Sequence, residues 1–202
     1  MLNPAFDHYS HEDVRRLIAE YPLAWVLCPG APAASASLLP MLGTYGEDGA
    51  LTGLVGHMSR RNPLHALFER EGKAQFLFTG PQGYVSAEHA GRRKWGPTWN
   101  YAQARIEADV HIDETLTAQA VARLVSTCEQ GREQPWNVAE LEERYTGMLG
   151  MIIGFEARVT ALDATFKLGQ DESPDVLEAI LASHPDADLR EWMEAFNRDR
   201  RK

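Results

Sequence analysis

The chain has 202 residues, of which 44% are hydrophobic and 24% are charged. This composition is that of a folded globular protein and excludes an intrinsically disordered chain, and no run of about 18 apolar residues predicts a membrane span. The net charge of −9 disfavours general binding to nucleic acids. Because the N-terminus lacks the features of a secretory signal, we expect a cytoplasmic protein in which Cys28 and Cys128 are buried, reduced thiols.

The N-terminal segment predicts one helix and one strand. Ser10 suits a helix N-cap, with Asp13 three residues further on, and Pro22 ends this helix. The apolar run at 23–28 is short and uninterrupted, so we expect a strand that is buried on both faces.

A hairpin and a second helix follow. Two apolar runs on either side of the Gly/Asp turn at 46–49 predict the hairpin. Asn62 and Pro63 have the chemistry of a helix start, and Gly72 is placed to end that helix. Two further short strands are expected at 74–78, closed by Gly80 and Pro81, and at 84–86.

The second half alternates between strands and helices. Apolar and polar residues alternate without interruption over 102–112, which predicts a strand with one buried face. Helices are expected at 117–129, with Val121, Leu124, Val125 and Cys128 on the apolar side, and at 139–149. The remaining elements are a strand at 153–159 with a possible hairpin partner at 165–168, and helices that begin at 173–174 and at 186.

The order of these elements predicts the fold class. Strands are joined by hairpins, and few strand–helix–strand crossovers occur. This order favours an α+β protein with an antiparallel β-barrel and flanking helices.

The segment at 56–63 carries the chemistry best suited to an anion. It leads from a predicted strand into the start of a predicted helix, where backbone N–H groups point outward. The Ser59 hydroxyl and the Arg60 and Arg61 guanidinium groups complete a cradle for phosphate. Considered alone, the segment is more simply explained as a capped helix with arginines on the surface.

A second segment, at 97–101, places aromatic and amide side chains at the start of the long alternating strand. Such side chains suit a planar ring system, or they anchor the strand. The sequence lacks the Cys, His and carboxylate spacings of metal sites and the GxSxG motif of hydrolases. It also lacks the glycine-rich motifs that bind nucleotides. A protein without its own reactive residues borrows its chemistry from a cofactor.

Several short motifs, in this order and spacing, resemble the PaiB family of FMN-binding split-barrel proteins. The resemblance covers about residues 1–171. The matching residues are Gly56-His57, Arg60 and Asn62-Pro63; Phe78, Gly80-Pro81, Tyr84 and Ser86; the segment from Pro97 to Ala102; Glu129 and Pro135-Trp136; and Gly154-Phe155-Glu156.

The resemblance implies a homodimer of six-stranded split barrels with FMN at the subunit interface. It assigns the phosphate to Ser59 and Arg60, with His57 and Asn62 nearby. It places Thr98, Trp99 and Asn100 near the cofactor, and it brings Lys167 and Gln170 from the partner subunit. Residues 1–171 form the FMN-binding domain in this interpretation, and residues 172–202 form a helical C-terminal extension.

The resemblance leaves three functions open. The first is FMN binding with flavin-dependent oxidoreductase activity. The second is transcriptional regulation, which the family's usual label suggests, although the sequence lacks a basic recognition helix and direct DNA binding is disfavoured. The third is an interaction module that has lost flavin, because residues 86–89 and 167–171 depart from the family's SPxWY and KLSQN segments.

Overall fold

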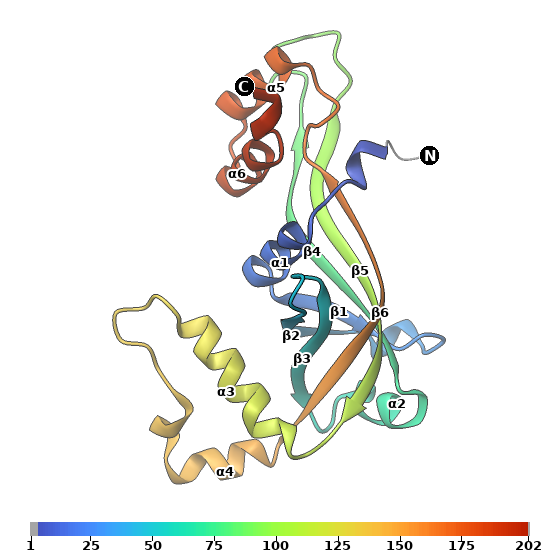
Figure 1. Ribbon diagram of the computed structural model, residues 1–202, viewed down its shortest axis with the longest axis vertical. Coiled ribbons are helices and arrows are strands. Elements are labelled where there is room, and N and C mark those ends of the chain that lie inside the picture. The colour runs from blue at the N-terminus through green and yellow to red at the C-terminus, as the bar shows by residue number, and fades with distance from the viewer. Residues whose placement is uncertain (1–3, 202) are drawn as a thin grey trace.

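The computed structural model describes residues 4–201. Six antiparallel strands close a barrel in the order β1-β2-β3-β6-β5-β4 (Figure 1), which confirms the predicted fold class. The strands are β1 (Leu23–Leu27), β2 (Ser37–Tyr45), β3 (Leu51–Ser59), β4 (Lys73–Val85), β5 (Thr98–Ile112) and β6 (Ile152–Lys167). The helices are α1 (His11–Glu20), α2 (Pro63–Glu71), α3 (Leu116–Glu129), α4 (Glu143–Leu149), α5 (Pro174–Ser183) and α6 (Ala187–Phe196).

Alternate side chains of every strand fill the inside of the barrel. This follows from the period of two along a strand, which sends successive side chains to opposite faces. The inward side chains include Val26, Met41, Leu54, Phe76, Ile106 and Phe155, all of which are almost fully buried. The same alternation contradicts the expectation for the first strand. Leu23 and Trp25 on β1 point outward and are half exposed, because this outer face is not covered.

Two of the strands are longer than expected. The run at 74–78 and the run at 84–86 are one strand, β4, because Gly80 and Pro81 sit in a bulge against β5 instead of ending the strand. Likewise, residues 165–168 are not a hairpin partner of 153–159. Residues 153–159 and 165–167 both belong to β6, whose 16 residues run continuously past a second irregularity in its pairing with β5, and Leu168 follows its end.

These long strands extend beyond the barrel, and the C-terminal helices α5 and α6 pack against the extension (Figure 1). Trp192 of α6 is buried and stacks on Phe166 of β6, with ring centroids 6.2 Å apart. Its indole N–H donates to Glu20 of α1 at 2.8 Å. The extension, α1 and α6 are therefore parts of one hydrophobic core.

Local chemistry sets the helix boundaries as expected. Ser10 and Asp13 form a capping box at the start of α1. The Asn62 side chain caps α2, and Gly72 ends it in the left-handed conformation with φ 61°. The expected helix at 139–149 is instead divided into a 3₁₀ turn, Val138–Leu141, and α4, because Glu142 lies between them with φ 48°.

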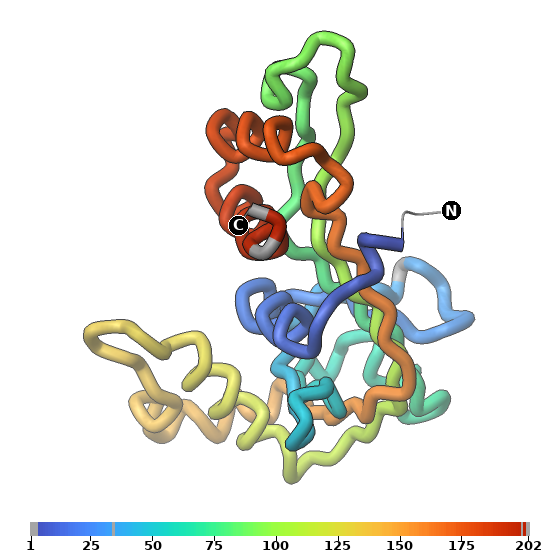
Figure 2. The backbone as a smooth tube through the Cα atoms, turned by 45° about the horizontal axis from the view of Figure 1, so that its top comes forward, coloured from blue at the N-terminus to red at the C-terminus, as the bar shows by residue number. Residues whose placement is uncertain are grey.

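Helices α3 and α4 form an arm that stands away from the barrel (Figure 1 and Figure 2). Only the first turns of α3 touch the barrel closely. Gly154 of β6 donates its N–H to the Thr117 hydroxyl at 2.9 Å, and a Cβ at this glycine would lie 2.8 Å from the Thr117 Cα. Glycine at 154 thus allows the helix to approach the strand.

The outer part of α3 corrects a further expectation. Within α3, the buried residues are Thr117 and Ala120, whereas Val121, Leu124 and Val125 are only half-buried. Cys128 is exposed, although Cys28 is buried as predicted. The reason is that α3 diverges from the barrel, so its second half lies farther from the strands than its first turns do (Figure 1).

Among residues 4–201, none of the helices combines the length and the apolar character that crossing a membrane requires.

Candidate functional site

The first group of predicted site residues lies where β3 ends and α2 begins. Ser59 is exposed, and its hydroxyl oxygen accepts a hydrogen bond from the Arg61 N–H at 3.2 Å. Asn62 caps α2 by accepting from Leu64 N–H at 2.9 Å, and its amide donates to the Ser37 hydroxyl at 3.0 Å. Asn62 therefore holds the loop in shape, while Ser59 and the helix start face solvent.

Arg60 is the central cation of this loop. Its backbone N–H donates to Met151 of the segment before β6 at 3.0 Å, and its carbonyl accepts from the His65 ring at 3.1 Å. These two bonds fix the backbone of the loop. The guanidinium group forms an ion pair with Glu114 at 2.8 Å. A carboxylate thus contacts the side chain that the sequence assigns to a phosphate.

His57 lies three residues before Arg60, on β3, beside Gly154 of β6. Its Nδ1 is buried and has no hydrogen-bond partner among the described residues. Burial lowers the pKa of the His57 imidazole below its ordinary value, so the neutral ring is favoured at neutral pH.

This pKa shift predicts a pH dependence of stability. The folded pKa lies below the unfolded value near 6.5, so the unfolded chain binds a proton first as the pH falls. The stabilisation is present above about pH 6.5 and is lost as the pH falls through the folded pKa. We expect His57→Gln to lose less stability than the wild type between neutral and acidic pH, measured by urea unfolding. The exposed His8→Gln is the control, and an unchanged pH profile in His57→Gln would contradict the assignment.

The second group of predicted residues lies on the extension, at the start of β5 and the end of β6. Lys167 of β6 donates from its ammonium group to the Thr98 hydroxyl of β5, and it lies 5.7 Å from the centre of the Phe6 ring. Gln170 closes the turn after β6 by donating to the Phe166 carbonyl and accepting from Leu168 N–H.

Trp99 and Asn100 face opposite sides of the extension, as neighbours on a strand must. Trp99 is 56% exposed, and its ring lies 5.8 Å from the ring of Tyr84, its partner on β4. Asn100 is 2% exposed and its amide contacts the sulfur of Met193 at 3.5 Å. The exposed surface is therefore aromatic, whereas Asn100 packs against α6.

The two groups lie at opposite ends of β6. Ser59 pairs with Ile152, the first residue of this strand, and Lys167 is its last residue. A strand of 16 residues with a rise of roughly 3.3 Å per residue spans roughly 50 Å. Within one chain, therefore, these groups do not meet in a single site.

Sequence reasoning missed two contacts in these groups. Glu114 pairs with Arg60 from 54 residues away, and nothing in the local pattern distinguishes it from other acidic residues. Tyr84 was part of a recognised motif, and its pairing with Trp99 follows once β4 and β5 are aligned in register.

The closed six-stranded antiparallel barrel with flanking helices is a split-barrel fold. The chain belongs to the family described as "Putative FMN-binding domain", whose model matches residues 1–161. Because the family is described as FMN-binding, FMN is the cofactor of this chain. The exposed Ser59 hydroxyl and the Arg60 guanidinium suit the phosphate end of FMN, and the exposed pair of Trp99 and Tyr84 suits its planar ring.

Solved structures share the fold at low sequence identity. The FAD and heme binding protein from Mycobacterium smegmatis is 22% identical with a TM-score of 0.61, covering 87% of this chain and 79% of that one. The flavocytochrome Anf3 from Azotobacter vinelandii is 16% identical with a TM-score of 0.57, covering 89% of this chain and 75% of that one. Among curated protein sequences, none matches this chain.

Proposed function

We propose that this chain is a homodimeric FMN protein of the PaiB-like type, in which each flavin lies between two copies. The loop at Ser59 and Arg60 of one copy holds the phosphate, and the face around Trp99 and Lys167 of the other copy contacts the ring. Bound flavin supplies redox chemistry, so the activity we expect is that of a flavin-dependent oxidoreductase.

The observation that carries this proposal is the position of the two groups at opposite ends of β6. One chain cannot bring both to one flavin, but a second copy in a two-fold arrangement brings the end of one chain to the start of the other. The exposed apolar residues Leu23 and Trp25 on β1 and Leu38 on β2 support such a contact, since Trp25 and Leu38 are neighbours in the sheet.

The ion pair between Arg60 and Glu114 is compatible with phosphate binding. Both side chains are partly exposed, and an ion pair in that setting contributes only about 0–1 kcal/mol. A phosphate dianion offers Arg60 more charge than one carboxylate and can accept two parallel N–H bonds from the guanidinium group. Exchange of Glu114 for the phosphate is therefore favourable.

The remaining residues of the groups position these contacts. Asn62 fixes the position of the α2 start by capping it and binding Ser37. Thr98 holds the Lys167 ammonium at the end of β6, where a positive charge suits an electron-accepting ring. Asn100 and Gln170 stabilise the strand ends from the inner side.

The first test is the visible absorption spectrum of the purified protein before and after addition of FMN. We expect the purified protein to show flavin absorption bands, or added FMN to show the shifted bands of bound flavin during the titration. Light scattering should give the mass of a dimer. If high FMN concentrations produce no binding, the flavin proposal is wrong and the interaction-module alternative is favoured.

A mixing experiment tests whether the site is shared. Arg60→Ala and Lys167→Ala each damage one side of every site, so each variant alone should bind FMN weakly. Co-expressed copies form mixed dimers with one intact site, and we expect roughly a quarter of the wild-type sites to bind normally. If co-expression restores nothing while each variant alone is impaired, both groups serve a site within one chain and the shared site is wrong.

A further inference from the structure

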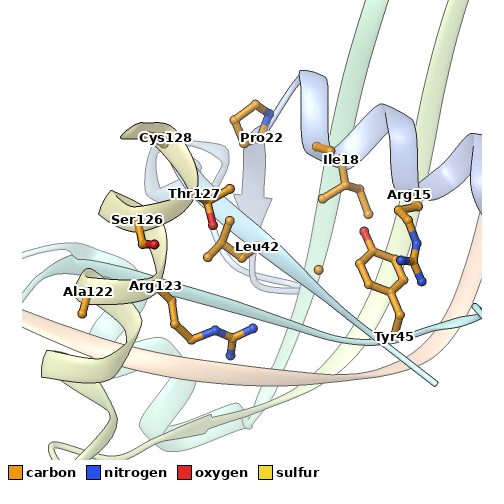
Figure 3. A pocket seen from close by; sticks show the side chains of 12 residues that line it. Arg15, Ile18, Pro22, Leu42, Tyr45, Ala122, Arg123, Ser126, Thr127 and Cys128 are labelled. Atoms are coloured by element: carbon orange, nitrogen blue, oxygen red, sulfur yellow. The ribbon is translucent and has the colours of Figure 1, made fainter. Parts of the chain in front are cut away.

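A cleft lies between α1, β2 and α3, and none of the predicted flavin residues line it (Figure 3). Its volume of about 550 Å³ falls in the range of sites that hold small organic ligands, about 300–1,000 Å³. The cleft exists because α3 packs tightly on Gly154 at its start and then diverges from the barrel.

The floor and inner wall of this cleft are apolar. Ile18 of α1, Pro22 just after that helix and Leu42 of β2 contribute hydrocarbon surface. Ala122 does so from the facing side of α3. Leu42 points out of the barrel because its neighbour Met41 points in. Ile18 is itself only 2% exposed, so an apolar body of about ring size would mainly cover Pro22, Leu42 and Ala122, which water still reaches.

One wall carries a stacked arginine and tyrosine. The Arg15 guanidinium lies 4.2 Å from the centre of the Tyr45 ring and 3.7 Å from a Glu12 oxygen. The Arg15 Nε is buried and has no hydrogen-bond partner among the described residues. Burial raises the pKa of the Tyr45 phenol, which keeps this hydroxyl neutral as a hydrogen-bond donor.

The facing wall carries a second arginine. Arg123 projects from α3 into the space beside β2 (Figure 3), with the hydroxyls of Ser126 and Thr127 along the same helix. Within residues 4–201 the structure shows no carboxylate paired with Arg123. In a chain of net charge −9, an unpaired cation facing an apolar cleft attracts small anions.

We propose that this cleft binds an amphipathic carboxylate. The apolar body, of about the size of one or two rings, lies against Ile18 and Leu42, and the carboxylate accepts hydrogen bonds from Arg123, with Arg15 and Tyr45 at the far wall. Arginine is suited to this role because its planar guanidinium donates two parallel N–H bonds to a carboxylate. The site is separate from the flavin groups and does not depend on them.

A matched pair of probes tests the charge and the apolar body separately. The probes are 1-naphthoate and 1-naphthalenemethanol, titrated calorimetrically into the full-length protein. We expect naphthoate to bind about tenfold more tightly than the alcohol, because only the carboxylate forms a charge-assisted hydrogen bond. Arg123→Gln should reduce naphthoate binding to the level of the alcohol, whereas Arg93→Gln, the same change on a distant exposed loop, and Arg60→Ala in the flavin loop should leave it unchanged.

A variant that fills the cleft tests whether the probes bind there. Ala122→Trp places an indole in the cleft and should abolish binding of both probes while the thermal unfolding curve stays cooperative. Equal binding of the two probes, or full naphthoate binding by Arg123→Gln, overturns the proposal. It is also overturned if Arg60→Ala removes naphthoate binding, which would place the probe in the flavin site. The last outcome concerns a second copy of the chain. If the wild type binds neither probe and Ala122→Trp changes the oligomeric state, a second copy covers the cleft. This outcome also overturns the proposal.

Discussion

Replacing Arg60 by alanine is expected to weaken FMN binding by about 10- to 100-fold, the value of a hydrogen bond between charged groups. The guanidinium lies beside the start of α2, where the exposed Ser59 hydroxyl and the positive end of the helix dipole favour an anion. The N–H groups of Arg61 and Leu64 are already bonded to Ser59 and Asn62, so the side chains carry most of the phosphate contact. The backbone of Arg60 is held by Met151 and His65, so removal of the side chain leaves the loop in place. The measurement is the quenching of FMN fluorescence on titration with protein.

Two companion variants make this result specific. Arg70→Ala removes an exposed arginine at the other end of α2 and should leave FMN affinity unchanged. Glu114→Gln releases Arg60 from its carboxylate partner and should leave affinity equal to or tighter than that of the wild type. If Arg60→Ala binds FMN as the wild type does, the phosphate lies elsewhere and the assignment of this loop is wrong.

Replacing Trp192 by alanine is expected to lower the free energy of unfolding by about 3–5 kcal/mol, the usual cost of removing a buried large aromatic side chain. Trp192 is 1% exposed and stacks on both Phe166 and Phe196. Its loss also leaves Glu20 without its indole donor. Urea unfolding followed by far-UV circular dichroism measures the effect.

The control separates burial from aromatic content. Trp136, in the loop of the arm, is 37% exposed, and Trp136→Ala should change stability by less than about 1 kcal/mol. Should Trp192→Ala fail to fold, Trp192→Phe retains the stacking and should show an intermediate loss. A loss of less than about 1 kcal/mol in Trp192→Ala would mean that α6 contributes little to the core.

The C-terminal helices also support the exposed face around Trp99 and Lys167. Helix α6 packs on the inner side of the extension, where Asn100 meets Met193 and Phe166 meets Trp192. Residues 172–202 lie outside the matched family region, yet they cover the strands that carry Trp99 and Lys167. We therefore expect a chain truncated after residue 171 to lose this face as well as stability.

The sequence by itself determined the elements whose causes are local. Ser10, Asn62 and Gly72 set helix ends through their own hydrogen bonds and backbone freedom, and alternation along 102–112 predicted most of β5, up to its end at Ile112. The same local reasoning predicts an anion at the loop of Ser59 and Arg60, from hydroxyl and guanidinium groups beside a helix start, and this assignment stays a prediction.

Only the tertiary structure decided the features that depend on distant partners. Gly80 and Pro81 are turn residues by local preference, but pairing with β5 absorbs them in a bulge and keeps β4 continuous. Cys128 lies on an apolar stripe, but it is exposed because α3 leaves the barrel. The partnership of Arg60 with Glu114, the burial of Asn100 and the separation of the two flavin groups along β6 all arise from contacts between residues far apart in the chain. No pattern within a short segment encodes such contacts.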